Sequence, residues 1–132
     1  MDLTNKKEIS KVRIKQAKEF LNDAKTVIVT GGYKTVANRS YYAIFHAMRA
    51  VLAFDGIDRK KHSSLISEFR KLYIKTKVFN DNMSDIITKL FYIRINSDYE
   101  DFFVISKREI EQQLKNAEYF VNEIEKFLKI KK

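Results

Sequence analysis

The chain has no proline and only three glycines among its 132 residues, so it carries very few of the residues that tight turns require. A sandwich or barrel of short strands needs a turn about every 8–12 residues, and an all-β fold is therefore excluded. The 10 phenylalanines and 7 tyrosines supply enough apolar area for a core, so a disordered chain is not expected either. We predict a compact all-α fold in a single domain that spans residues 1–132.

Apolar residues recur every three or four positions in five separate stretches, which is the spacing of helices with one buried face. The first stretch covers residues 9–28 and ends at Gly31 and Gly32. The second covers residues 33–54, is richer in aromatic residues and ends before Gly56. A shorter third helix is expected within residues 58–77. With the two helices that follow, these stretches predict an up-and-down bundle of four to five helices.

Polar residues mark the ends of the last two predicted helices. Asp81 and Asn82 are suited to cap the fourth helix, and its apolar pattern fails around residues 96–98. Asn, Ser and Asp at those positions favour caps and turns, so we expect the helix to break there. Ser106 and Glu109 form a capping box that predicts the start of the fifth helix. Its apolar residues then alternate by four and three up to Leu128, as in a coiled coil.

The composition excludes several kinds of site. Without cysteine the chain has no disulfide, no thiolate nucleophile and no cysteine-containing zinc site, and two histidines are too few for a histidine cluster. We therefore expect neither a metal nor a cofactor. No apolar run approaches the roughly 20 residues that span a bilayer, and the N-terminus is polar rather than signal-like. A cytoplasmic protein without membrane contact is expected.

The charge of the chain is unevenly distributed. The 26 Lys and Arg outnumber the 17 Asp and Glu, which gives a net charge of +9. Residues 58–77 hold seven basic and two acidic residues, whereas residues 80–101 hold five acidic and two basic ones. A basic lobe of this kind suits a polyanion, RNA in particular. The alternative is a solvated helix face without a ligand.

A polar stripe runs along the second predicted helix. Arg39, Tyr42, His46 and Arg49 are separated by three, four and three residues, so all four project from one side of a largely apolar helix. Arginine binds phosphate, tyrosine donates a hydrogen bond, and histidine exchanges a proton near neutral pH. These residues indicate a cleft for a nucleotide or RNA. The alternative is that the stripe is simply the solvent-exposed side of the helix, or that His46 is a hydrogen-bonded core histidine.

Arg94, Asp98 and Tyr99 form a second candidate group. On a continuous helix Arg94 and Tyr99 would point about 140° apart, so only the expected break at residues 96–98 brings them together. Asp98 would then orient Arg94 or Tyr99. The alternative is an ordinary surface ion pair between Arg94 and Asp98.

Lys61, His62 and Ser63 form a third group, at the start of the third predicted helix. Positive charge and free backbone N–H groups at a helix start can hold an anion. Ser63 also has the side chain of a simple N-cap, and we expect it to take that role.

Three strings of the sequence together resemble the small stand-alone HEPN proteins. They are ANRSYYAIFHA at residues 37–47, KHS at residues 61–63, and Arg94 followed by SDY at residues 97–99. The resemblance covers nearly the whole chain. It implies a bundle of four or five helices that forms a homodimer. It also implies frequent pairing with a minimal nucleotidyltransferase, which serves as the antitoxin in toxin–antitoxin or abortive-infection modules.

Active HEPN ribonucleases carry an arginine followed, after four to six residues, by a histidine, and two such motifs face each other across a dimer cleft to cut RNA without metal. Arg39 and His46 have six residues between them and fit this spacing. Position along the fold instead selects Arg94, and Tyr99 then stands where the histidine is expected. A phenol with a pKa of about 10 is a poor base at pH 7, so full ribonuclease activity does not follow from the resemblance.

The resemblance therefore leaves two functions open. In the first, the chain is a toxin-like module that acts on RNA or nucleotides at a basic, dimeric cleft, as a metal-independent endoribonuclease. In the second, it is a non-catalytic accessory subunit that binds a nucleotide or protein and partners a nucleotidyltransferase, for which Tyr99 is the preferred nucleotide acceptor. The candidate catalytic residues are Arg94, Tyr99, Asp98, Arg39 and His46. The candidate residues for nucleic-acid or nucleotide binding are Tyr42, Arg49, Lys61, His62 and Ser63.

Overall fold

The computed structural model describes residues 3–99 and 103–131, and every regular element in those two ranges is helical. The predicted all-α class is confirmed. The second helix has the bounds that the sequence predicts. The elements in chain order are α1 (Leu3–Val29), α2 (Tyr33–Phe54), α3 (His62–Phe69), the π-helical segment η1 (Arg70–Ile74), α4 (Asp81–Tyr99) and α5 (Lys107–Lys131).

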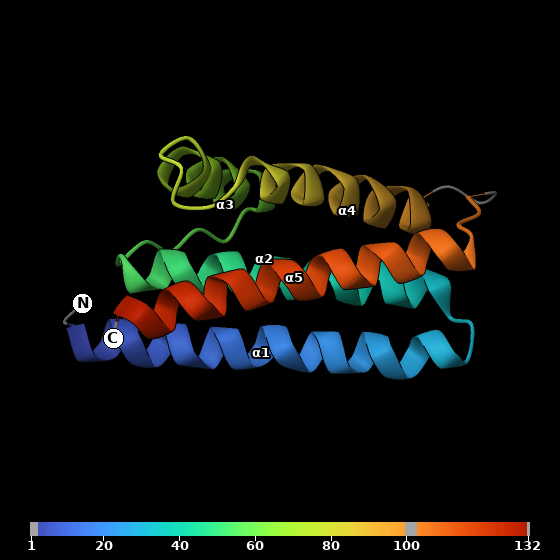
Figure 1. Cartoon of the computed structure of the whole chain (residues 1–132), viewed down its shortest axis with the longest axis horizontal. Coiled ribbons are helices and arrows are strands. Elements are labelled where there is room, and N and C mark those ends of the chain that lie inside the picture. Colours follow the sequence, from blue (N-terminus) through green and yellow to red (C-terminus); the bar gives the residue numbers. More distant parts are fainter. Residues whose placement is uncertain (1–2, 100–102, 132) are drawn as a thin grey trace.

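The helices form a bundle around α2. In Figure 1, α2 and α5 lie between α1 on one side and α3 with α4 on the other. Helix α2 packs against α1, α5, α4 and α3 in turn. Thirteen of its 22 residues are buried, among them Tyr41, Ile44 and Met48. This helix is therefore the centre of the core, as its apolar and aromatic composition predicts.

Glycines end the first two helices. Gly31 has a φ of +82°, and its N–H donates to the carbonyl of Ile28 at 3.2 Å. Gly56 has a φ of +79° and follows the last turn of α2 in the same way, donating to the carbonyl of Ala53 at 2.9 Å. Only glycine takes this conformation without steric cost. The short link at Gly31 turns the chain back so that α2 packs along α1.

The Ser106 half of the predicted capping box is confirmed, whereas the Glu109 carboxylate pairs with Lys89 and accepts a hydrogen bond from Gln113. The backbone N–H of Glu109 donates to the Ser106 Oγ at 3.1 Å, and the N–H of Ile110 donates to the Ser106 carbonyl at 3.0 Å. Helix α5 then buries its apolar seam against α2 and α1. The buried residues of that seam are Ile110, Leu114, Ala117, Val121, Ile124 and Leu128.

The third and fourth helices differ from the prediction. After Phe69 the chain widens into η1, where the N–H of Lys75 donates to the carbonyl of Arg70, five residues earlier, at 2.9 Å. Helix α4 shows no break at residues 96–98 and continues to Tyr99. The Asn96 side chain donates to the Tyr92 carbonyl one turn earlier at 2.8 Å, and Ser97 is buried. Packing of this turn against the bundle outweighs the local preference of both residues for caps and turns.

Among the residues that the structure describes, none of the helices combines the length and the apolar character needed to cross a bilayer.

The Ser106 cap gives a direct test of this end of the fold. Ser106→Ala removes the acceptor for the Glu109 N–H, and we expect it to lower the free energy of unfolding by about 1 kcal/mol. Ser106→Asp is the matched control, because a carboxylate also accepts this bond and interacts favourably with the helix dipole. Urea unfolding followed by circular dichroism measures both changes. Equal stability of the alanine variant and the wild type would contradict the prediction.

Candidate functional site

Arg94 of α4 lies over the polar stripe of α2. Its guanidinium carbon is 5.3 Å from the ring centroid of Tyr41 and 5.4 Å from that of Tyr42, and its Nη2 donates to the Tyr42 hydroxyl at 3.2 Å. The Arg94 side chain is 19% exposed, and its Nε is 3.7 Å from the Asp98 carboxylate. At this distance Asp98 forms an ion pair with Arg94 but no hydrogen bond, and the buried Nε has no hydrogen-bond partner among the described residues. Stacking on two aromatic faces holds the charged group in one position.

His62, the first residue of α3, joins this group through Tyr41. The Tyr41 hydroxyl and the His62 Nδ1 are 2.6 Å apart, and the His62 ring stacks on Phe45 with centroids 4.3 Å apart. Burial raises the pKa of Tyr41 far above its ordinary value, so its hydroxyl keeps its proton at neutral pH. Burial, and then the charge of Arg94, lower the pKa of His62, which is neutral at pH 7. If the Tyr41 hydroxyl donates to Nδ1, His62 carries its proton on Nε2; if the hydroxyl accepts, the proton lies on Nδ1.

We call Arg94, Tyr41, Tyr42 and His62 the Arg94 cluster. A second group shares Tyr42 with it. The ring of Phe20, from α1, stacks on His46 at 5.2 Å and on Tyr42 at 5.9 Å between centroids, and the Arg39 guanidinium carbon is 5.6 Å from the Phe20 centroid. The structure therefore brings Arg39, Tyr42 and His46 together, as the spacing on the second helix predicts.

His46 lies in a strongly electropositive environment. Burial lowers its pKa most, and the charges of Arg49, Arg13 and His62 lower it further, to about 4. Its buried Nδ1 has no hydrogen-bond partner among the described residues. An imidazole with this pKa is neutral at pH 7 and takes up a proton reluctantly, so His46 is a weak general base.

Arg49 is engaged in an ion pair. Its Nη2 is 3.2 Å from the Asp58 Oδ1, and an Arg13 nitrogen is 3.5 Å from the same oxygen. Burial raises the pKa of Asp58, but the Arg49 hydrogen bond and the charges of Arg13, Arg49 and Lys60 outweigh this effect, and the net pKa lies below its ordinary value. Asp58 is therefore ionised at pH 7. Its negative charge neutralises part of the positive charge of Arg49, which the sequence indicates as a nucleotide-binding residue.

The start of α3 differs from the expectation for Ser63. Lys61 takes the N-cap position without a side-chain hydrogen bond to the helix, and Ser63 lies inside the first turn. The predicted cap at Ser63 is therefore wrong. The first helical residue is His62, whose ring is drawn inward by Tyr41 and Phe45, and this contact sets where the helix begins. Lys61 and Ser63 remain exposed.

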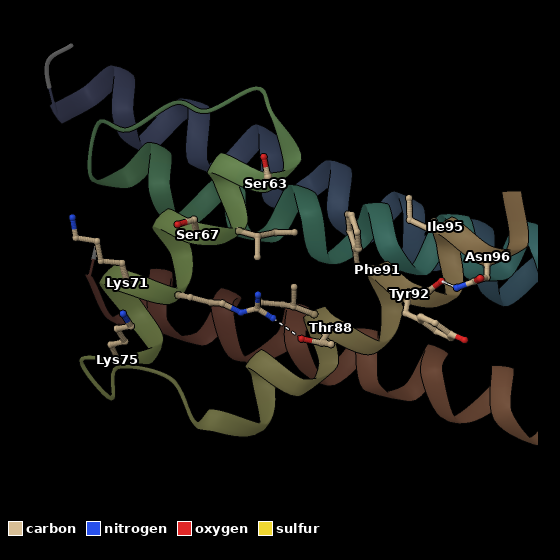
Figure 2. A pocket seen from close by; sticks show the side chains of 12 residues that line it. Ser63, Ser67, Lys71, Lys75, Thr88, Phe91, Tyr92, Ile95 and Asn96 are labelled. Atoms are coloured by element: carbon tan, nitrogen blue, oxygen red, sulfur yellow. Dashed lines mark hydrogen bonds between the residues drawn. The ribbon is translucent and has the colours of Figure 1, made fainter. Parts of the chain in front are cut away.

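A hollow of about 740 Å³ lies between α3 with η1 and α4. Figure 2 shows Ser63 and Ser67 on one side, Phe91 and Ile95 on the other, and Lys71 and Lys75 at one end. Arg39, His46 and Arg94 do not line it. The hollow nevertheless adjoins the Arg94 cluster, because Phe91 in its wall contacts the Tyr41 ring edge-on at 5.7 Å between centroids. Its lining is Ser63, Ile66, Ser67, Arg70, Lys71, Lys75, Ile87, Thr88, Phe91, Tyr92, Ile95 and Asn96.

Tyr99 is the last residue of α4, and its side chain lies outside the described residues. Because the helix is continuous from Arg94 to Tyr99, the break that was expected to bring these two residues together does not occur. Residues five apart on a helix point about 140° away from each other.

Two residues that organise the site, Phe20 and Tyr41, are not among the candidates that the sequence indicates. Each has the spacing of a core residue, and only their aromatic neighbours reveal a further role. The pair Tyr41-Tyr42 within the HEPN-like string is a signal for Tyr41, because adjacent helix positions point to different neighbours. No comparable signal marks Phe20.

Among the described residues, no three histidine, aspartate or glutamate side chains lie together in a way that suits a metal ion.

The lowered pKa of His46 predicts how stability depends on pH. In the unfolded chain His46 binds a proton below about pH 6.5, whereas in the folded protein His46 binds one only near pH 4. Between these pH values protonation of His46 therefore stabilises the unfolded state. We expect wild type to lose more free energy of unfolding between about pH 7 and about pH 5 than His46→Gln, which does not titrate. Urea unfolding of both proteins at both pH values measures the two losses. The carboxylates are the same in both proteins, so their contribution cancels when the two losses are compared. Equal losses would contradict the lowered pKa.

Comparison with known proteins assigns the family. A model of the HEPN domain matches residues 10–127. A Thermotoga maritima protein named "UPF0332 protein" is 27% identical over 126 residues, covering 96% of each chain. Two Methanocaldococcus jannaschii proteins have names that include "Putative toxin". One is 30% identical over 97% of this chain and 86% of its own length. The other is 33% identical over 88% of this chain and 86% of its own length. The chain therefore belongs to the HEPN domain family.

Proposed function

We propose that this HEPN protein is a toxin-like module that binds RNA at the Arg94 cluster. The observation that carries the proposal is the position of Arg94, whose guanidinium is held over two tyrosine rings beside the imidazole of His62, which we take to carry its proton on Nε2. A fixed guanidinium with an adjacent donor suits a phosphate group, and the partly exposed ring of Tyr42 suits a nucleobase. The net charge of +9 favours association with a polyanion. The names of the two Methanocaldococcus relatives support the toxin-like role.

Cleavage of RNA is the second part of the proposal. Two copies of the chain pair so that their Arg94 clusters face each other, as the HEPN resemblance implies. The ribose 2′-hydroxyl passes its proton to solvent water as its oxygen attacks the adjacent phosphorus, and the displaced 5′-oxygen takes up a proton from solvent water. Arg94 stabilises the charge that develops on the phosphate oxygens, and His62 donates to one of them. Because His46 is a weak base and His62 Nδ1 is occupied by Tyr41, we expect this reaction to be slow.

RNA binding tests the proposal. We expect Arg94→Ala to weaken binding of a fluorescently labelled uridine dodecanucleotide about tenfold in an anisotropy titration, because the variant has no guanidinium to bind the phosphate. Lys25→Gln, on α1, is the control, since its ammonium pairs with Glu118 away from the Arg94 cluster. Wild-type protein that does not bind the oligonucleotide at low salt would contradict the proposal.

Analysis of the same RNA after incubation with the protein distinguishes cleavage from binding alone. In EDTA, wild-type protein is expected to leave 2′,3′-cyclic phosphate ends slowly, and Arg94→Ala to leave the RNA intact over the same time. Cleavage at an unchanged rate by Arg94→Ala would contradict the role of Arg94. RNA that stays bound and intact with wild-type protein would favour the second candidate function below.

The second candidate is a non-catalytic accessory subunit that partners a nucleotidyltransferase. The observation that favours it is that burial lowers the pKa values of both imidazoles of the site, which weakens them as bases. In this function the partner transfers a nucleotide from ATP to a tyrosine near the site. The tyrosine oxygen attacks the α-phosphorus, pyrophosphate leaves, and the phenolic proton passes to solvent or to the partner.

Tyr99 is the preferred acceptor. If a nucleotidyltransferase is encoded beside this protein's gene, we expect intact-mass spectra after incubation with that enzyme and ATP to show one adenylate increment on wild type and none on Tyr99→Phe. Tyr92→Phe is the matched control, because Tyr92 is an exposed tyrosine on the same helix. An increment that persists in Tyr99→Phe would reject Tyr99 as the acceptor.

A further inference from the structure

The hollow between α3, η1 and α4 has a lining of unusual composition. Its floor is apolar, with Ile66, Ile87, Phe91 and Ile95. Its rim carries arginine and lysine side chains, and no aspartate or glutamate lines it. An occupant that matches this lining combines flat apolar groups with negative charge.

The cations of the rim are not neutralised by carboxylates. Arg70 donates from Nε to the Ser84 Oγ at 2.9 Å and from Nη2 to the Ser84 carbonyl at 3.1 Å and the Thr88 Oγ1 at 2.6 Å, the last of which Figure 2 shows as a dashed line. All three acceptors are uncharged. Within the part of the chain that the structure describes, no carboxylate pairs with Arg70, Lys71 or Lys75. These bonds fix the direction of the Arg70 guanidinium without cancelling its charge.

Aromatic rings line the opposite end of the hollow. Tyr92 is 57% exposed and Phe91 is 36% exposed, although both belong to a helix that packs in the bundle. Figure 2 shows Lys71 and Lys75 at one end and Tyr92 with Asn96 at the other. Phe91 lies between the hollow and the Arg94 cluster, since its ring contacts Tyr41. A polymer strand bound at the Arg94 cluster that crosses Phe91 would therefore reach the hollow.

We propose that this hollow is a second subsite for single-stranded RNA, in which bases stack on Phe91 and Tyr92 and backbone phosphates lie against Arg70, Lys71 and Lys75. The inference rests on the proposed function and extends the same strand beyond the Arg94 cluster. Base stacking on exposed aromatic rings and a row of cations that follows the backbone are the two features that bind single strands regardless of sequence.

A second copy of this chain fits the hollow less well than RNA. If the hollow lies on the axis of a two-fold interface, its lining meets the same lining of the second copy. The cations of the rim then approach one another, and the lining offers no carboxylate to offset them. RNA brings the missing negative charge.

Length-dependent binding tests the subsite. A uridine dinucleotide is short enough to occupy the Arg94 cluster alone, whereas a uridine dodecanucleotide also reaches the hollow. We expect Lys71→Gln/Lys75→Gln to weaken binding of the dodecanucleotide about tenfold, to lower its salt slope by about 0.7 for each phosphate that is no longer neutralised, and to leave the dinucleotide unchanged. Tyr92→Ala is expected to weaken the dodecanucleotide by a similar factor.

The control carries the same change of charge elsewhere. Lys15→Gln/Lys25→Gln alters α1, which lies on the far side of the bundle from α3 and α4 (Figure 1), and is expected to leave dodecanucleotide binding within about twofold of wild type. If the control weakens binding as much as Lys71→Gln/Lys75→Gln does, the effect is one of net charge and the subsite is rejected.

Crosslinking locates the RNA directly. A dodecanucleotide that contains 4-thiouridine is irradiated on wild-type protein, and the protein is digested with trypsin. We expect adducts on Phe91 or Tyr92, located by fragmenting the peptide of residues 90–94, because that peptide also holds Arg94 of the Arg94 cluster. Adducts confined to the peptide of residues 40–49 would support binding at the Arg94 cluster and reject the subsite. An absence of binding to wild type would instead reject the proposed function.

Light scattering tests whether a second copy of this chain, rather than RNA, occupies the hollow. Wild type and Tyr92→Ala are expected to have the same molar mass in solution without RNA. A dimer that becomes a monomer on this substitution would show that the hollow is a protein interface, and would overturn the proposal.

Discussion

The burial of α2 on several sides is the constraint on which the candidate site depends. Helices α1, α4 and α5 all pack against it, and only one narrow stripe is left for its large polar side chains. Phe20 reaches this stripe from α1 and Arg94 reaches it from α4. The site is therefore built where α1, α2, α3 and α4 meet, and its geometry follows from the packing of the core.

Burial also decides the chemistry of the site. It raises the pKa of Tyr41 and lowers the pKa values of His46 and His62, so at neutral pH the phenol stays protonated and both imidazoles are uncharged. The guanidinium of Arg94 lies beside these groups and 3.7 Å from the Asp98 carboxylate. The outcome is a surface that combines a guanidinium with imidazoles that are weakened as bases. Such a surface stabilises anions more readily than it removes protons.

Much of the fold follows from the sequence, because apolar spacing and helix-end residues act locally. Gly31 and the Ser106 cap end and begin helices as predicted. The prediction fails where distant contacts outweigh local preference: α4 continues past Asn96 because the bundle holds that turn, and α3 begins at His62 because its ring binds Tyr41. The stripe of Arg39, Tyr42 and His46 is predictable from spacing on one helix. The contribution of Phe20 is not, since it depends on how α1 lies against α2.

The π-helical segment η1 has a consequence for the angular position of the residues that follow it. Its Arg70–Lys75 hydrogen bond spans five residues, one more than an α-helix accommodates. Deleting one residue from η1 would restore ordinary helical winding and rotate Lys75 by about 100° about the axis. Ile87 and Phe91 on α4 would keep their places while the ammonium group turned away from them. Among HEPN proteins, a change of segment length by a single residue is thus sufficient to alter the charge beside this hollow without any change in residue type.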